Sequence, residues 1–222
     1  MDDRSWGGGE TTAETNGAPL EEFLADPAHC TLDLASVVAD CAKLLDSMTD
    51  VPAYVRNARF DVLAANALGR ALYAPAFDSP LFARRGPVNT ARFLFLDPAG
   101  RDFRTDWDKG ADDSVAFLRS ETGRAPHDRA LTDLIGELTT RSDEFARRWA
   151  RHDVKIHRSG VKRLHPPLVG DLALPYEAMD LPADPGLRLN FHTPAPDSPQ
   201  REALSLLAGW ASTGTVAPSH ND

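Results

Sequence analysis

The stretch VPAYVRNARFDVLAANALGRALYAP, residues 51–75, constrains the fold most strongly because it encodes two short strands and the start of a helix. A polar turn separates the two strands, and in the second one Phe60, Val62 and Ala64 share one parity. This period of two is typical of a strand with one buried face. Asn66 then stands where a helix N-cap is expected. The segment therefore predicts a β-hairpin that leads directly into a helix.

Two further segments have the periodicity of amphipathic helices. Apolar residues fall on one stripe over residues 37–48, and a longer apolar series keeps helical spacing from His127 through Trp149. The helix over residues 37–48 needs an apolar surface, which is either the sheet of its own chain or a second copy in a homodimer. Packing on its own sheet is the simpler expectation.

The last third of the chain changes to a period of two. Residues 152–158 alternate, residues 159–160 form a turn signal, and a returning strand begins at Val161 and continues through residues 168–174. A final alternating segment at residues 187–192 adds another strand. The order of elements along the chain is two strands, several helices and then three strands. This order is typical of one antiparallel sheet and does not fit a parallel βαβ alternation. We therefore expect an α+β fold with a PAS-like antiparallel sheet, helices covering one face and a cavity between them.

Composition divides the chain into three parts. Residues 1–35 are rich in small and polar residues, so we expect a largely disordered N-terminal segment. Residues 36–212 form the predicted PAS-like ligand-binding domain, and residues 213–222 form a disordered tail.

The charge balance excludes several classes of partner. Thirty-three acidic residues against 24 basic ones leave a net charge of −9, which repels phosphate backbones and anionic lipids. We therefore expect no direct nucleic-acid binding and no membrane association. The sequence contains neither a leader pattern nor a long apolar run, so a cytoplasmic location is expected. Cys30 and Cys41 form neither a disulfide framework nor a paired metal motif.

Motifs for catalysis are missing from the sequence. It has no G-x-S-x-G nucleophile turn, no H-E-x-x-H pair and no glycine-rich phosphate loop after a strand. Neighbouring acids at residues 112–113 and 143–144 diverge on a helix instead of converging on one bond. We therefore expect no enzymatic activity, no catalytic residues, no cofactor and no metal site.

A cluster of basic residues in the strand-rich third gives a hypothesis for ligand binding. A two-residue turn at residues 159–160 would place His152, Arg163 and His165 on one face together with aliphatic side chains. If that face borders the cavity, Arg163 with His152 or His165 anchors a carboxylate. The alternative is that these side chains reach solvent at the sheet edge or pair with acidic residues.

Arg92 lies in the otherwise apolar run ARFLFL and needs a partner if it is buried. It either contacts a ligand head group or pairs with Asp97 or Glu144. Aromatic residues at strand and helix spacing either line a pocket or belong to an ordinary core. The candidate ligand-binding residues are therefore Tyr54, Asn66, Tyr73, Arg92, Phe93, Phe117, His152, Arg163 and His165.

Five separated blocks carry a resemblance to a known family. They are VPAYVRNARFDVLAANALGRALYAP, NTARFLFLDP, TRSDEFARRWARHDV, HPPLVGDLALPYEAM and LRLNFHTPAPDSP. In this order they resemble the ligand-binding domain of MmyB-like transcription regulators, which belong to the XRE helix-turn-helix class, over about residues 44–212. The resemblance implies a PAS-type fold, a pocket for fatty-acid-like or other small apolar ligands, and DNA binding by a separate N-terminal domain.

The chain departs from that family in its N-terminal part. Only about 43 residues precede the resembling region, and they contain no basic recognition helix. We therefore expect a ligand-sensing domain for a small amphipathic molecule, such as a fatty acid, that lacks its own DNA-binding domain. One alternative is that the true reading frame starts upstream. Another is a protein–protein interaction module without ligand that acts with a separate DNA-binding partner. An empty space between sheet and helices would distinguish the ligand-sensing domain from this module.

Overall fold

The computed structural model describes residues 34–83, 86–151, 159–182, 184 and 186–213. The predicted disordered segments, 1–35 and 213–222, lie almost entirely outside these residues. The strands are β1 (Ala53–Arg56), β2 (Val62–Ala65), β3 (Ser159–Leu164), β4 (Leu172–Asp180) and β5 (Arg188–His192). They form one antiparallel sheet in the order β2-β1-β5-β4-β3, so the first hairpin lies beside the last strand. The predicted α+β fold with an antiparallel sheet is confirmed.

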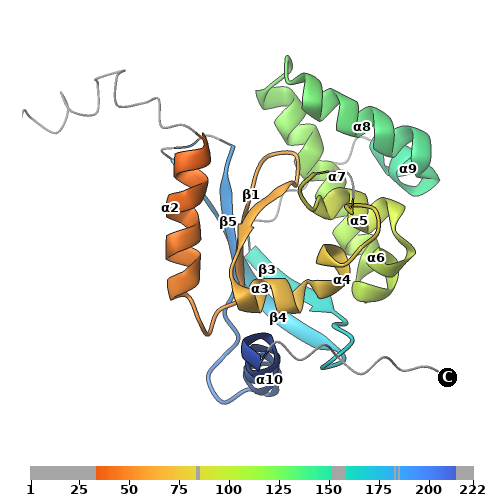
Figure 1. The fold of residues 1–222 in the computed structure, drawn as a ribbon. Coiled ribbons are helices and arrows are strands. Elements are labelled where there is room, and N and C mark those ends of the chain that lie inside the picture. The colour runs from red at the N-terminus through yellow and green to blue at the C-terminus, as the bar shows by residue number, and fades with distance from the viewer. Residues whose placement is uncertain (1–33, 84–85, 152–158, 183, 185, 214–222) are drawn as a thin grey trace, which may run out of the picture. The chain divides into compact units, whose positions relative to one another are not determined.

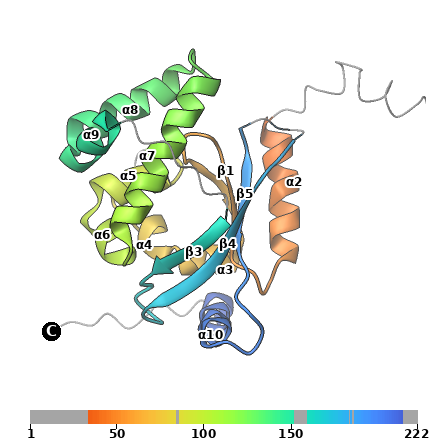
Figure 2. The same ribbon diagram turned by 180° about the vertical axis from the view of Figure 1, so that it is seen from behind.

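Helices pack on both faces of this sheet, whereas the sequence predicted helices on one face. They are α2 (Leu34–Ser47), α3 (Ala67–Leu72), α4 (Ala74–Phe77), α5 (Thr90–Leu96), α6 (Pro98–Phe103), α7 (Trp107–Arg124), α8 (Arg129–Arg141), α9 (Asp143–Ala150) and α10 (Pro199–Thr213). In Figure 1 and in the reverse view of Figure 2, α2 lies on one side of the sheet and α4 to α9 lie on the other. We call the face toward α5, α6 and α7 the inner face. None of the helices in the described residues combines the length and apolar character needed to cross a bilayer.

The outer face of the sheet is covered by α2. Val37 and Leu45 of this helix pack with Val55, Ala64 and Leu187 in one buried cluster. Burying these aliphatic side chains is the main favourable contribution of this layer. The helix predicted over residues 37–48 therefore packs on the sheet of its own chain, and the homodimer stays a prediction.

The turn predicted at residues 159–160 is wrong. Both residues lie within β3 and pair with β4, and the chain reverses later, between Pro166 and Asp171. Two amide groups there donate to the carbonyl oxygen of Pro166, and Gly170 adopts a φ of 70°. Glycine takes this conformation without steric cost, which is why the reversal occurs here. The other predicted strand of that hairpin, residues 152–158, lies outside the described residues.

The helix predicted from His127 through Trp149 is two helices, α8 and α9. Ser142 separates them in an extended conformation, and its side-chain oxygen accepts a hydrogen bond from the Phe145 amide at 3.2 Å. This is an N-cap, which starts a new helix without changing the apolar spacing. Residues of both helices accordingly pack in one cluster that includes Leu138 and Phe145.

Asn66 joins three elements at the start of α3. Its Oδ1 accepts hydrogen bonds from the amides of Gly69 at 2.7 Å and Ala53 at 3.1 Å. Its Nδ2 donates to the carbonyl oxygens of Met48 and Val51 at 2.6 and 2.7 Å. The predicted helix cap is confirmed, and the same side chain ties α3 to β1 and to the connection after α2.

The close contact between α3 and β1 gives a stability prediction. A Cβ at Gly69 would lie 2.5 Å from the backbone oxygen of Ala53, whereas a Cβ at Gly136 in α8 meets nothing within 4 Å. We expect Gly69→Ala to lower the free energy of unfolding by about 1–3 kcal/mol because backbone atoms must move apart. Gly136→Ala should raise it by up to about 1 kcal/mol through helix propensity. Urea denaturation followed by circular dichroism measures both; changes of the same sign would contradict this packing.

Candidate functional site

A cavity of about 120 Å³ lies between the inner face of the sheet and helices α5, α6 and α7. Its aromatic lining residues are Tyr54, Phe60, Tyr73, Phe93, Phe103, Phe117 and Tyr176. Its charged and amide lining residues are Arg56, Arg104, Asp113, Lys162, Arg188 and Asn190. Aromatic walls with a few polar groups are typical of small-molecule sites, and here four of the five charged side chains are cationic.

The register of β1 and β5 places the polar lining residues side by side. Arg56 pairs with Arg188, and Tyr54 pairs with Asn190 on the neighbouring strand. Residues opposite each other in an antiparallel pair point to the same face. Arg56, Arg188 and Asn190 are all buried. The inner face of this sheet therefore contains buried polar groups, each of which requires a partner.

Lys162 of β3 extends its ammonium group into a cage of three tyrosines. Its Nζ lies 3.4 Å from the Tyr54 hydroxyl, 3.5 Å from the Tyr73 hydroxyl and 4.6 Å from the centre of the Tyr176 ring. Ring faces attract a cation, and the two hydroxyl oxygens accept hydrogen bonds from it. Burial lowers the pKa of Lys162, and the positive charges of Arg104 and Arg56 lower it further.

His192 fixes the direction of the hydrogen bonds behind this cage. The ring is fully buried; Nδ1 lies 3.2 Å from the Pro175 carbonyl oxygen and Nε2 lies 3.0 Å from the Tyr73 hydroxyl. A carbonyl oxygen only accepts, so Nδ1 carries the proton and Nε2 accepts from Tyr73. The Tyr73 oxygen is then left to accept from Lys162.

Arg56 and Arg188 form a second cationic group on the inner face. Their guanidinium carbons lie 4.4 and 4.5 Å from the centre of the Phe117 ring. Arg188 forms an ion pair with Asp180, while Arg56 donates to the carbonyl oxygen of Asn57 at 3.0 Å. Burial lowers the pKa of Arg56 to about 10, and the charge of Arg188 contributes to this shift, so Arg56 is still charged at neutral pH.

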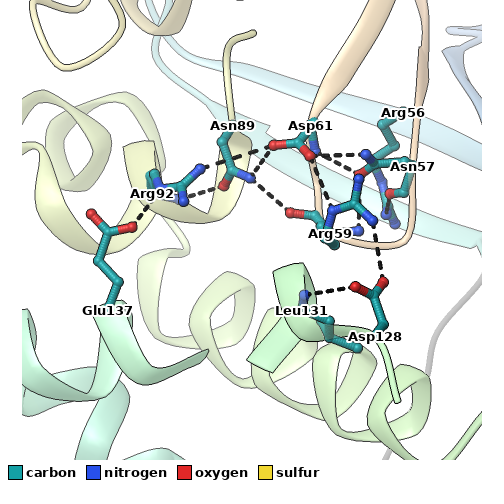
Figure 3. Close-up of polar contacts among 9 residues, drawn as sticks. All are labelled: Arg56, Asn57, Arg59, Asp61, Asn89, Arg92, Asp128, Leu131 and Glu137. Atoms are coloured by element: carbon teal, nitrogen blue, oxygen red, sulfur yellow. Dashed lines mark hydrogen bonds and ion pairs between the residues drawn. The ribbon is translucent and has the colours of Figure 1, made fainter. Parts of the chain in front are cut away.

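A separate polar network fixes the hairpin to the helices over the cavity (Figure 3). The buried Asn89 caps α5 by accepting from the Arg92 amide at 2.8 Å, and its Nδ2 donates to Asp61 at 2.8 Å and to the Arg59 carbonyl oxygen at 2.7 Å. Arg92 donates to Glu137 of α8 at 2.8 Å. The network therefore joins the β1–β2 turn, α5 and α8.

Six of the nine predicted ligand-binding residues lie on β1, on the helices or at their caps. Four of them line the cavity, namely Tyr54, Tyr73, Phe93 and Phe117. Asn66 and Arg92 lie outside its lining and are engaged in the contacts described above. Arg92 forms ion pairs with Glu137 at 2.8 Å and with Asp61 at 4.0 Å, so the expected pairing with Asp97 or Glu144 was wrong.

Arg163 and His165 follow the second alternative given for them, because they reach solvent or pair with an acidic residue and do not line the cavity. Lys162 and Leu164 line the cavity, whereas Arg163 is exposed and His165 forms an exposed ion pair with Asp171 at 2.6 Å. The strand pairs with β4 through a turn placed later than predicted, and this register turns the apolar Val161 outward, where it is 45% exposed. His152 lies outside the described residues.

Several lining residues were missed by the sequence analysis. They are chiefly Arg56, Arg104, Lys162, Tyr176, Arg188 and Asn190. The alternation of β5 was recognised from the sequence. However, its apolar residues Leu189 and Phe191 face α2, and the polar residues that alternate with them face the cavity. One pattern in the sequence could have indicated these residues. Every second residue of the strand is polar, with cationic and amide groups among them, and amphipathic helices flank the sheet on both sides, so the polar face of the strand is also covered.

The buried His192 gives a pH prediction. Burial and the charge of Lys162 hold its pKa well below the usual value of about 6.5, so the unfolded chain takes up a proton that the folded chain does not. The stability due to the neutral ring is fully present above about pH 6.5 and falls by up to about 1.4 kcal/mol per pH unit below it. His192→Gln cannot titrate, so its unfolding free energy should fall less between pH 6.5 and 5. Urea denaturation across this range measures the difference; equal slopes would contradict it.

Comparison with known proteins identifies the family. No curated protein matches the chain. Residues 37–207 match the family model of the MmyB-like transcription regulator ligand binding domain, and these residues include the whole sheet and every residue that lines the cavity. Because the match covers most of the 222 residues, the chain belongs to the MmyB-like transcription regulator ligand-binding domain family.

Proposed function

We propose that this domain senses a small amphipathic carboxylic acid of fatty-acid-like chemistry, and that it does so by binding and not by catalysis. The family assignment supports ligand sensing in transcription regulation. The observation that carries the ligand class is the ammonium group of Lys162, which lies in an aromatic cavity. A cation beside apolar walls suits a molecule with an anionic head and a hydrocarbon body.

The energetics of Lys162 support an anionic head group. Among the described residues, no carboxylate lies within 4 Å of its Nζ, and its contacts are hydroxyl oxygens and ring faces. A buried charge without a counter-charge is costly, so a carboxylate in the cavity would stabilise it. Hydrogen bonds between ionised groups are also about twice as strong as those between neutral ones.

The aromatic walls support the hydrocarbon part of the ligand. Phe93 of α5, Phe103 of α6 and Phe117 of α7 are buried and face the cavity from the helical side. Each CH₂ group removed from water against such walls contributes about 0.8 kcal/mol. The presence of a cavity favours this function over an interaction module with a filled core. A separate DNA-binding partner stays a prediction.

Lys162→Met tests the head-group contact. Methionine keeps an unbranched apolar stem but removes the charge, so we expect the affinity for hexanoate to fall by about ten- to a hundredfold. Lys43→Met is the matched control because Lys43 is exposed on α2, and it should bind as the original protein does. Isothermal titration calorimetry measures both affinities. Equal affinity of the Lys162→Met and Lys43→Met variants would contradict the proposal.

A further inference from the structure

Within the part of the chain that the structure describes, two cationic groups of the cavity have no ion-pair partner. Of its four lining cations, Arg104 is paired with Asp106 at 2.9 Å and Arg188 is paired with Asp180. The lining carboxylate, Asp113, is bound by Lys109 at 2.7 Å. Among the described residues, neither Arg56 nor Lys162 has a carboxylate within 4 Å. Counted over the described residues, the cavity lining therefore carries a surplus of two positive charges.

The carboxylates that act on Arg56 are also engaged with other arginines. Glu121 and Asp180 are the carboxylates whose charges reach Arg56, and they are bound by Arg124 at 3.5 Å and by Arg188. Arg56 also lies directly opposite Arg188 on the neighbouring strand. Like charges in directly opposed positions of a sheet are destabilising. In the described residues, the Arg56 guanidinium makes one hydrogen bond, and Arg56 is one of the residues that line the cavity.

The two unpaired cations lie at different places along the inner face. Tyr54 is two residues from Arg56 on β1, which corresponds to a spacing of about 7 Å along one face of a strand. The Nζ of Lys162 lies 3.4 Å from the Tyr54 hydroxyl, whereas the Arg56 guanidinium carbon lies 4.2 and 4.4 Å from the centres of the Phe60 and Phe117 rings, so the two cations contact different groups. Each cation therefore offers its own contact for a carboxylate, at the N···O distance of about 4 Å or less that an ion pair needs.

Building on the function proposed for this cavity, we propose that its ligand is a compact dicarboxylic acid, with one carboxylate at Arg56 and Arg188 and the other at Lys162. The two negative charges match the surplus of two positive charges. An arginine also binds a carboxylate through parallel N–H donors, a geometry that Lys162 cannot offer at the other end.

The volume of the cavity supports a compact ligand. About 120 Å³ lies below the roughly 300–1,000 Å³ of typical ligand pockets. A short chain between two carboxylates fits both this volume and the aromatic walls around the cations.

Matched pairs of acids test the proposal on the full-length protein. Succinate, glutarate, adipate and suberate are titrated by calorimetry, each beside its monomethyl ester, which has nearly the same size but one charge less. We expect the best diacid to bind at least about tenfold more tightly than its ester. In Arg56→Gln this difference should disappear, while Arg129→Gln, at an exposed position of α8, should retain it.

The outcomes separate this proposal from the function on which it rests. If each ester binds the unmodified protein as tightly as its diacid, the second carboxylate site is wrong and a monocarboxylate site remains. If neither diacids, esters nor hexanoate bind, both the dicarboxylate and the carboxylate-sensing proposals are overturned. Because the first comparison needs no substitution, it does not depend on whether the Arg56→Gln variant folds.

Discussion

A sheet that is covered on both faces must bury both sets of its side chains, and in this protein one set is polar. Helix α2 packs on the aliphatic set, which includes Val55 and Leu187. Helices α5, α6 and α7 cover the other set, which includes Arg56, Asn190 and His192. Buried polar groups need partners, so the placement of the tyrosines, the histidine and the acidic residues around this face follows from that one requirement.

The helices over the cavity are fixed in place by polar contacts and not by apolar packing alone. Asn89 combines an N-cap on α5 with hydrogen bonds to the hairpin, and Arg92 connects the same helix to Glu137 of α8. These contacts lie beside the cavity, so they stabilise its walls without occupying its space. A site held in this way is preorganised for a ligand, which lowers the ordering cost of binding.

Local signals in the sequence predicted the fold well. The hairpin, the Asn66 cap and the amphipathic helix on the sheet are each encoded by neighbouring residues, and the order of elements was enough to place β1 beside β5. The site was harder to predict. Choosing the buried face of a strand by its apolar residues assumes that the other face meets solvent, and this assumption fails for β5 and for Lys162 in β3. Tertiary partners decide those orientations, and a single strand does not encode them.

The hydrogen bonds behind the cavity have a fixed polarity. From the Pro175 carbonyl oxygen through His192 to Tyr73, each donor hydrogen points away from the cavity. The oxygen of Tyr73 therefore presents only lone pairs to a bound molecule, and it repels a carboxylate oxygen while it accepts from a hydroxyl or an ammonium group. If the ligand is an acid, as proposed above, its carboxylate approaches Lys162 from the side away from Tyr73, and the tyrosine oxygen then restricts the orientation of that ligand.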